Sequence, residues 1–228
     1  DLAQRLDVSE VTIRKDLVLM EGQGLLLRTY GGAILAEDSP AVIGFTEKSR
    51  QALHEKEQIA RKAFELVRPG QSILLDSGTT CLALAHLLRG MDVQVITNSL
   101  SAVRALAAGG DDSSLVILGG SYRPVTGAII GDSAVQQVRQ YNIDVAFLGA
   151  SGATPEGGFS CQNMLEAQIK RAMWRQAARR VILMDSSKFG TNRFAAFAGY
   201  DDVHTVITDT AIPDDHRRAL LEHNIEVL

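Results

Sequence analysis

The chain has 228 residues, of which 46% are hydrophobic and 22% are charged, values that exclude disordered and fibrous proteins. Its net charge of −4 excludes binding to nucleic acid through bulk positive charge, so any DNA contact must be local. No apolar run reaches the roughly 18 residues that span a bilayer, and two scattered cysteines suit a reducing compartment. We therefore expect a cytoplasmic protein without membrane contact, with about one and a half average domains.

The first part of the chain is predicted to form two helices and then a hairpin. The pattern indicates a helix, a turn, a second helix and two extended segments: residues 2–6, 7–8, 10–21, 25–28 and 33–35. Ser9 is a suitable N-cap for the second helix, and glycines suit the hairpin tip. The inner face would consist of Leu2, Ala3, Leu6, Val8, Ile13 and Leu17. The sequence thus predicts a helix-turn-helix with a wing over residues 1–36, followed by a linker over residues 37–50.

The second helix and the hairpin carry side chains that suit contact with double-stranded DNA. In a helix-turn-helix, the start of the second helix enters the major groove, where hydroxyl and basic groups reach phosphates and base edges. The predicted DNA-binding residues are Ser9, Val11, Thr12, Arg14, Lys15, Arg28, Gly31 and Gly32. The alternative is a helical unit that contacts only protein, because Glu10, Asp16 and Glu21 balance the basic side chains.

From residue 51 onward the pattern predicts an α/β fold with an open, mainly parallel, doubly wound sheet. Short aliphatic runs indicate strands buried on both faces, at residues 72–76, 93–97, 115–118, 145–148, 181–185 and 203–208. Amphipathic stretches indicate helices at residues 51–67, 81–88, 100–108, 133–141, 164–178 and 214–223. Regular alternation of strand and helix is typical of this fold class, so residues 51–228 are assigned to one domain.

Polar and glycine-rich turns follow five of the predicted strands. Sites in open α/β sheets lie beyond the carboxyl ends of the strands, and N–H groups at a helix start attract anions. The residues predicted to bind a small anionic effector there are Asp76, Ser77, Gly78, Thr79, Thr80, Asn98, Ser99, Gly119, Gly120, Gly149, Ser151, Gly152 and Lys188. Ordinary turn and capping chemistry is the alternative, because the same residue types fill such turns.

Charged side chains refine this prediction. Lys188 is a point cation at a strand end, which suits a phosphate. Glu166 could hydrogen-bond a sugar hydroxyl or act as a base, or it could only compensate the helix dipole. Arg123 could close over the ligand or remain in solvent. No G-x-G-x-x-G follows the first strand, and the five histidines are scattered, so we expect no cofactor and no metal.

Six short motifs occur in a fixed order, at residues 8–17, 24–33, 76–80, 97–99, 119–120 and 185–188. Together they resemble the DeoR family of bacterial transcription regulators. The helix that precedes Leu2 in that family has no counterpart in this sequence, so we expect a truncated winged helix. The resemblance implies a repressor of carbohydrate metabolism genes that binds operator DNA as a dimer or tetramer. It also implies that residues 51–228 bind a small phosphorylated sugar or a related metabolite as effector.

The effector domain of that family is similar to ribose-5-phosphate isomerase. Thr79-Thr80 resembles the phosphate loop of the enzyme, residues 185–188 resemble its lysine segment, and Glu166 lies near the place of its base. The Asp-Gly-Ala-Asp loop of the enzyme is replaced by residues 149–152, which contain no carboxylate. We therefore expect ligand binding with no catalytic residue. A sugar-phosphate isomerase-like enzyme is the alternative function, and a Rossmann oxidoreductase comes third.

Overall fold

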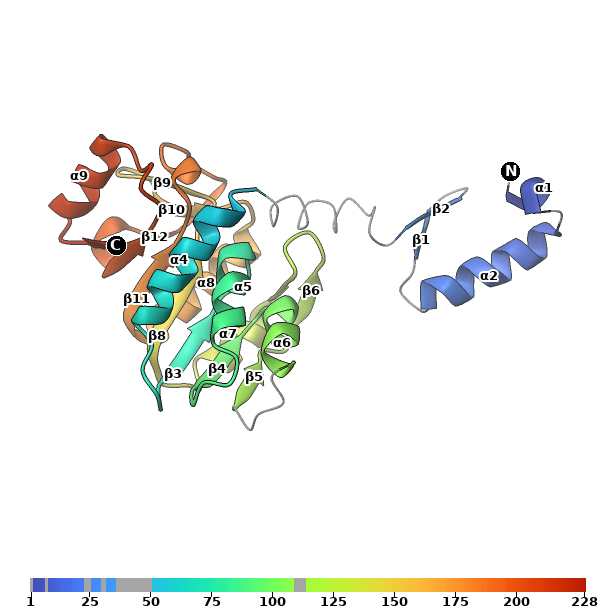
Figure 1. Ribbon diagram of the computed structural model, residues 1–228, viewed down its shortest axis with the longest axis horizontal. Coiled ribbons are helices and arrows are strands. Elements are labelled where there is room, and N and C mark those ends of the chain that lie inside the picture. Colours follow the sequence, from blue (N-terminus) through green and yellow to red (C-terminus); the bar gives the residue numbers. More distant parts are fainter. Residues whose placement is uncertain (1, 7, 23–25, 30–31, 36–50, 109–113) are drawn as a thin grey trace. The chain divides into compact units, whose positions relative to one another are not determined.

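The structure of the chain is a computed structural model that describes residues 2–6, 8–22, 26–29, 32–35, 51–108 and 114–228 (Figure 1). The chain divides into two compact units, Asp1–Lys48 and Ser49–Leu228. The predicted linker, residues 37–50, lies outside the described residues, so the predicted domain boundaries stay predictions.

The first unit contains the elements that the sequence predicts. They are α1 (Leu2–Leu6), α2 (Glu10–Gly22), β1 (Leu26–Thr29) and β2 (Gly32–Leu35). The hydroxyl of Ser9 caps α2 by accepting the Thr12 N–H at 3.1 Å. β1 and β2 pair antiparallel, with Thr29 opposite Gly32. The expected inner face is wrong for Leu6 and Val8, which are 62% and 41% exposed. A five-residue helix has little more than one turn with which to cover them.

The second unit is built on a seven-stranded sheet with the order β14-β13-β11-β8-β3-β4-β5. Its strands are β3 (Ser72–Leu75), β4 (Gln94–Thr97), β5 (Leu115–Ile117), β8 (Ile143–Gly149), β11 (Ala177–Leu183), β13 (Thr205–Ile207) and β14 (Glu226–Val227). All neighbouring strands are parallel. The chain winds outward from β3 to β5, then from β8 to β14. This arrangement confirms the doubly wound α/β fold.

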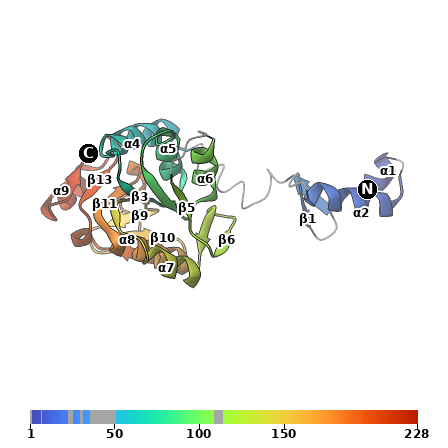
Figure 2. The ribbon, with the colours of Figure 1, turned by 90° about the horizontal axis from the view of Figure 1, so that it is seen from below.

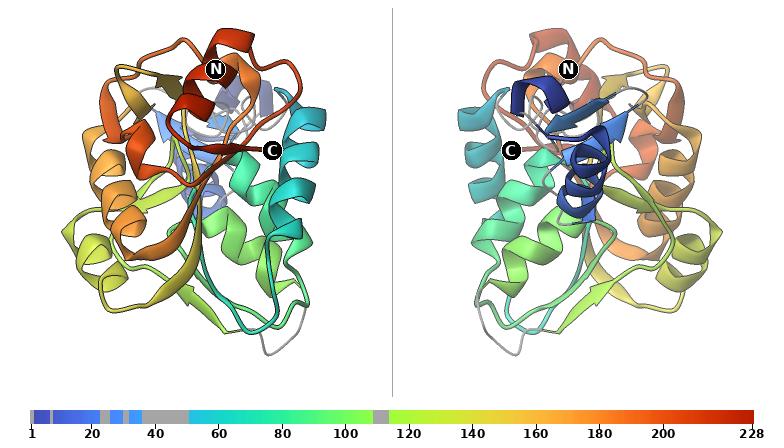
Figure 3. Two further views of the ribbon diagram at one scale, coloured as in Figure 1. Left: turned by 90° about the vertical axis from the view of Figure 1, so that its left-hand side faces the viewer. Right: turned by 90° about the vertical axis from the view of Figure 1, so that its right-hand side faces the viewer.

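Helices cover both faces of this sheet (Figures 2 and 3). They are α4 (Leu53–Glu65), α5 (Thr79–Leu87), α6 (Leu100–Ala107), α7 (Asp132–Val138), α8 (Met164–Gln176) and α9 (Asp214–Glu222). The strands pack alternate side chains into two apolar clusters. Leu75 of β3 packs with residues of α4, α5 and α6, whereas its neighbour Leu74 packs with residues of α7 and α8. Strands buried on both faces explain the continuous apolar runs in the sequence.

Short elements near the sheet were not predicted. They are the hairpin β6 (Ser121–Arg123) and β7 (Ala128–Ile130), the three-stranded sheet β9 (Gly152–Thr154), β10 (Gly158–Cys161) and β12 (Ala195–Ala198), and the 3-10 helices η2 (Ser186–Lys188) and η3 (Tyr200–Asp202). Such strands of three or four residues, several rich in glycine and alanine, give no clear apolar run.

The predicted boundary between α8 and β11 is wrong by several residues. The sequence predicts a helix to residue 178 and a strand from residue 181, but β11 begins at Ala177. Pairing with β8 explains the difference, because Ala177 lies opposite Ile143 and Arg179 opposite Val145. Among the described residues, no helix combines the length and the apolar character that crossing a membrane requires.

Candidate functional sites

The parallel strands bring several polar residues to one edge of the sheet. Asp76 follows β3, Asn98 follows β4, Gly149 ends β8 and Asp185 follows β11. Asp209, which the sequence analysis did not select, follows β13. Since the carboxyl ends of parallel strands share one edge, the predicted effector residues from separate segments meet there.

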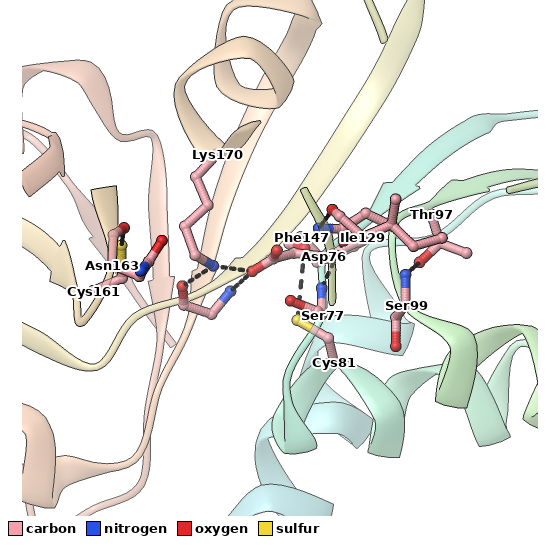
Figure 4. A network of polar contacts seen from close by, with 12 residues as sticks. Asp76, Ser77, Cys81, Thr97, Ser99, Ile129, Phe147, Cys161, Asn163 and Lys170 are labelled. Carbon is pink, nitrogen blue, oxygen red and sulfur yellow. Dashed lines mark hydrogen bonds and ion pairs between the residues drawn. The ribbon is translucent and has the colours of Figure 1, made fainter. Parts of the chain in front are cut away.

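A buried ion pair lies at the centre of this edge (Figure 4). The ammonium group of Lys170, on α8, donates to Asp76 Oδ2 and, at 2.9 Å, to the carbonyl oxygen of Gly149. The Gly149 N–H also donates to Asp76 Oδ2, at 3.1 Å. Burial lowers the pKa of Lys170, but the Asp76 carboxylate and its hydrogen bond raise it more, so the net pKa is raised. Lys170 therefore keeps its proton, and its contacts join α8 to β3 and β8.

The turn between β3 and α5 leaves the start of α5 open. Gly78 has φ +131°, and apart from its chain neighbours no atom of the described residues lies within 4 Å of where its Cβ would be. Ser77 and Thr79 are half-buried, whereas Thr80 is buried. The free N–H groups of the first helical turn and these hydroxyls can together bind an anion.

Two predicted effector residues have structural roles here. Asn98 accepts the Ser77 N–H at 3.0 Å and donates to the Ile129 carbonyl oxygen at 3.2 Å, so it ties the α5 turn to β7. Ser99 is buried and caps α6 by accepting the Ala102 N–H. For Ser99 the structure shows the ordinary capping role that the sequence analysis left open.

Glycines allow two loops to pack closely at the edge. A Cβ at Gly120, which has φ +155°, would lie 2.5 Å from the Ile130 carbonyl oxygen. A Cβ at Gly152 would lie 2.2 Å from the Thr191 carbonyl oxygen. The Gly119 N–H donates to Gln137 Oε1 at 2.8 Å, and the Ser151 carbonyl oxygen accepts from Arg193 Nε at 3.1 Å. These predicted site residues shape the edge through their backbone.

Arg123 and Glu166 pair with each other. Arg123, in β6, lies 3.0 Å from Glu166 Oε1 in the first turn of α8. The Glu166 side chain is 10% exposed and the Arg123 side chain 34%. An anionic ligand near Arg123 would compete with Glu166 for the guanidinium group.

Carboxylates hold the turn that carries Lys188. Asp185 accepts the Ser187 N–H at 3.2 Å, and Asp209 accepts the Ser186 N–H at 2.7 Å. Burial raises the pKa of Asp209, but the N–H of Ser186 and further hydrogen bonds lower it more, so the net pKa is lowered. Lys188 Nζ lies 3.8 Å from Asp185 Oδ2, and the Lys188 side chain remains 32% exposed. Lys188 thus keeps access to a ligand in solution.

No metal site is visible in the part of the chain that the structure describes, where no group of three or more His, Cys, Asp or Glu side chains could hold an ion. Cys81 and Cys161 are free and buried. Burial and then the Asp76 charge raise the pKa of the Cys81 thiol, so this cysteine is an unreactive packing residue.

The start of α2 presents the predicted DNA-binding side chains to solvent. Ser9, Val11, Thr12, Arg14 and Lys15 are all exposed. Arg14 Nη2 pairs with Glu10 Oε2 at 3.2 Å, an exposed contact that a phosphate can replace at little cost. Gly32 begins β2 and is exposed, whereas the Arg28 side chain and Gly31 lie outside the described residues.

A helix-turn-helix unit and an α/β unit with a polar strand-end site in one chain define the class of ligand-responsive transcription regulators. Residues 51–210 match the family model described as the DeoR C terminal sensor domain. Residues 1–39 match the DeoR-like helix-turn-helix domain. The chain belongs to the DeoR family. It is a transcription regulator, and the isomerase-like enzyme is not favoured.

Relatives match nearly the whole chain. The putative aga operon transcriptional repressor of Escherichia coli O157:H7 is 34% identical and covers 100% of this chain and 86% of its own. The glycerol-3-phosphate regulon repressor of Escherichia coli K12 is 32% identical, with coverages of 100% and 90%. The regulator FruR of Bacillus subtilis, described as uncharacterized, is 38% identical, with coverages of 92% and 83%.

One solved structure supports the α/β fold. The eIF2B delta structure from Chaetomium thermophilum matches with a TM-score of 0.51 at 14% identity, over 69% of this chain and 56% of that chain. Ribose 5-phosphate isomerase a from Methanocaldococcus jannaschii matches with a TM-score of 0.45 at 21% identity, over 61% and 55%. The first likeness concerns the fold alone, and the second carries no argument.

Proposed function

We propose that this regulator is a repressor of carbohydrate metabolism genes and that a small phosphorylated sugar, or a related metabolite, controls it. The observation that carries the proposal is the strand-end edge, where the open start of α5 and the partly exposed Lys188 lie beyond the same ends of one parallel sheet. Relatives named for the glycerol-3-phosphate regulon and the aga operon support a sugar-related effector.

The phosphate of the effector would lie at the start of α5. Ser77 supplies its hydroxyl group, Thr79 and Thr80 supply hydroxyl and N–H donors, and Lys188 supplies a full positive charge. Arg123 would exchange Glu166 for the ligand, which frees the Glu166 carboxylate to accept a sugar hydroxyl. Asp76 Oδ1 is buried and lacks a hydrogen-bond partner among the described residues, so it is a second candidate acceptor.

The exposed face of α2 would enter the major groove of operator DNA. Arg14 and Lys15 would contact phosphates or base edges, together with the hydroxyl groups of Ser9 and Thr12. A dimer or tetramer would bind two half-sites, as helix-turn-helix regulators commonly do. Effector binding then needs only a different affinity for the DNA-competent and DNA-incompetent states to release the operator. We place this activity in the cytoplasm.

Calorimetric titration tests the proposal. Sugar phosphates and the matching unphosphorylated sugars are added to the wild-type protein, with a coupled isomerase assay run on ribose 5-phosphate. We expect at least one phosphate ester to bind much more tightly than its parent sugar, with no turnover. Equal affinity for both members of every pair would contradict the phosphate site. Turnover that is lost in Glu166→Gln would restore the enzyme as the better function.

A further inference from the structure

A cavity of the second unit lies beside the C-terminal half of α8. Its volume is about 610 Å³, within the range of small-molecule sites, which runs from roughly 300 to 1,000 Å³. The turn after β9, the second half of α8, β12 and η3 line it, together with Arg180 of β11.

This cavity is separate from the strand-end edge. β9 begins with Gly152 at that edge, whereas the turn that follows its other end, with Glu156 and Gly157, lines the cavity. α8 contributes residues both to the strand-end edge and to the cavity. Glu166 and Lys170 bind at the edge, and the later residues of the same helix line the cavity. None of the residues proposed to bind the effector lines this cavity.

Three arginines line the cavity, alongside three acidic side chains, Glu156, Asp201 and Asp202. Arg171 donates to the Ala196 carbonyl oxygen, and Arg180 Nη1 donates to the Asp202 carbonyl oxygen at 3.2 Å. Arg175 is exposed. In the described part of the chain, none of the three pairs with a carboxylate. A guanidinium group has five donors, so these contacts fix Arg171 and Arg180 and leave donors for a ligand.

Two of the acidic side chains of the cavity wall bond to other residues of that wall. Asp201 Oδ1 lies 2.6 Å from His223 Nδ1, and Asp202 Oδ2 accepts the Gly199 N–H at 3.0 Å. Glu156 is exposed at the rim. Among the described residues, none of these carboxylates pairs with the three arginines, so the guanidinium groups keep donors for a ligand.

Two buried aromatic residues add unused donors. Trp174 is 4% exposed and Tyr200 is 3% exposed. Neither Trp174 Nε1 nor the Tyr200 hydroxyl has a hydrogen-bond partner among the described residues. Burial, and then the charge of Glu156, raises the pKa of Tyr200 to about 12, so the hydroxyl keeps its proton. A buried donor without an acceptor is unfavourable, and both residues belong to the lining of the cavity.

We propose that this cavity is a second ligand site, which binds a small organic anion through Arg171, Arg175 and Arg180. The anionic group is a phosphate or a carboxylate, because the arginine fork suits both. Trp174 forms the apolar wall beside it, in an edge-on contact with Phe197. The site is distinct from the effector site at the strand ends.

Tryptophan fluorescence tests this site directly, because Trp174 is the single tryptophan of the chain. The full-length protein is titrated separately with pyrophosphate and with citrate, against sodium chloride of equal ionic strength. We expect a saturable fluorescence change with pyrophosphate or citrate and none with chloride, and the more effective anion identifies the class. If neither anion gives a saturable fluorescence change, the proposal is overturned.

Matched variants locate the site. Arg175→Gln should weaken binding of the effective anion by about tenfold, as expected for the loss of a hydrogen bond to a charged group. Arg104→Gln, which removes another exposed charge, from α6, should bind as the wild type does. Lys188→Ala should also bind as the wild type does. Unchanged affinity in Arg175→Gln, or an equal loss in Lys188→Ala, would refute a separate anion site.

Discussion

At the scale of single residues, Lys170 holds the candidate effector site together. It is 6% exposed, and its partner Asp76 is 1% exposed. Removing one member of a buried ion pair leaves the other charge without compensation, which is far more costly than losing a surface pair. The pair thus fixes where the turn at the start of α5 lies relative to α8.

Replacing Lys170 with methionine should therefore destabilise the protein by about 3–5 kcal/mol. Lys62→Met is the matched control, because Lys62 pairs with Glu65 on the exposed surface of α4. The control should change the free energy of unfolding by no more than about 0.5 kcal/mol. Urea denaturation followed by circular dichroism measures both. Similar losses in the two variants would show that the buried pair is not fixed as described.

Asp209 makes stability depend on pH in acid. Its pKa is lowered below the ordinary value of 3.8 in the folded state. The folded state therefore gains stability from ionised Asp209 above pH 3.8 and loses it as the pH falls through the folded pKa. Asp209→Asn should be less stable than the wild type at pH 7, and this difference should shrink as the pH falls below about 3.8.

Denaturation at a series of pH values measures this difference. Asp92→Asn, an exposed side chain, provides the control and should match the wild type throughout. A gap between wild type and Asp209→Asn that stays constant from pH 7 to pH 3 would argue against the low pKa.

Sequence alone could predict where the candidate site lies but not its buried charges. The residues after β3, β4 and β11 were predicted because strand ends are visible as the last positions of apolar runs. Lys170 was missed because a lysine in a helix usually faces solvent. One signal was available: Lys170 follows Glu166 by four residues and precedes Met173 by three, so both charged groups share a helix face that also carries an apolar side chain.

At the scale of elements, the β6–β7 hairpin depends on one glycine. A Cβ at Gly120 would lie 2.5 Å from the Ile130 carbonyl oxygen. Gly120→Ala should therefore separate β6 from β7 and cost at least about 1 kcal/mol of stability. It should also weaken effector binding, because Arg123 lies in β6.

Gly70→Ala is the control for this variant. Gly70 has φ +79°, but no atom of the described residues lies within 4 Å of its Cβ position, so this change adds backbone strain without a clash. Gly120→Ala should show the larger fall in the unfolding midpoint. A smaller fall than in Gly70→Ala would mean that the hairpin can adjust without cost.

The start of α2 should supply the DNA contacts of the protein. Replacing both Arg14 and Lys15 with alanine should weaken operator binding, and each lost phosphate contact should flatten the salt slope by about one. A lost base contact should instead cost ~1–3 kcal/mol at one base position. Fluorescence anisotropy on selected DNA, at several salt concentrations, separates the two effects. Wild-type affinity in the double variant would exclude α2 as the recognition helix, and Arg104→Ala serves as the control.

Long elements were predictable and short ones were not. The six main strands and the helices between them were visible because each strand is an apolar run and each helix has an amphipathic face. β9, β10 and β12 escaped prediction because they consist of three or four residues and gain stability only by pairing with one another. These segments form one wall of the cavity that the three arginines line, so sequence reasoning could not find that cavity.

At the scale of the whole molecule, the function requires that two units share one chain. One unit presents basic and hydroxyl side chains on a helix, and the other presents a polar edge of a parallel sheet. A regulator of this kind works only if the effector binds the DNA-competent and DNA-incompetent states with different affinities. A change confined to the effector site should therefore alter release from DNA and leave binding without effector unchanged.

Release from DNA by effector, compared between wild type and Lys188→Ala, tests the central claim most directly. Fluorescence anisotropy of selected operator DNA is followed while a phosphorylated effector found by calorimetry is added. Both proteins should bind DNA equally without effector. Lys188→Ala should need about ten- to a hundred-fold more effector for release, because a hydrogen bond to a charged group contributes about 1.5–3 kcal/mol. Lys62→Ala should behave as the wild type does. Release of both proteins at the same effector concentration would contradict a phosphate site at the strand ends.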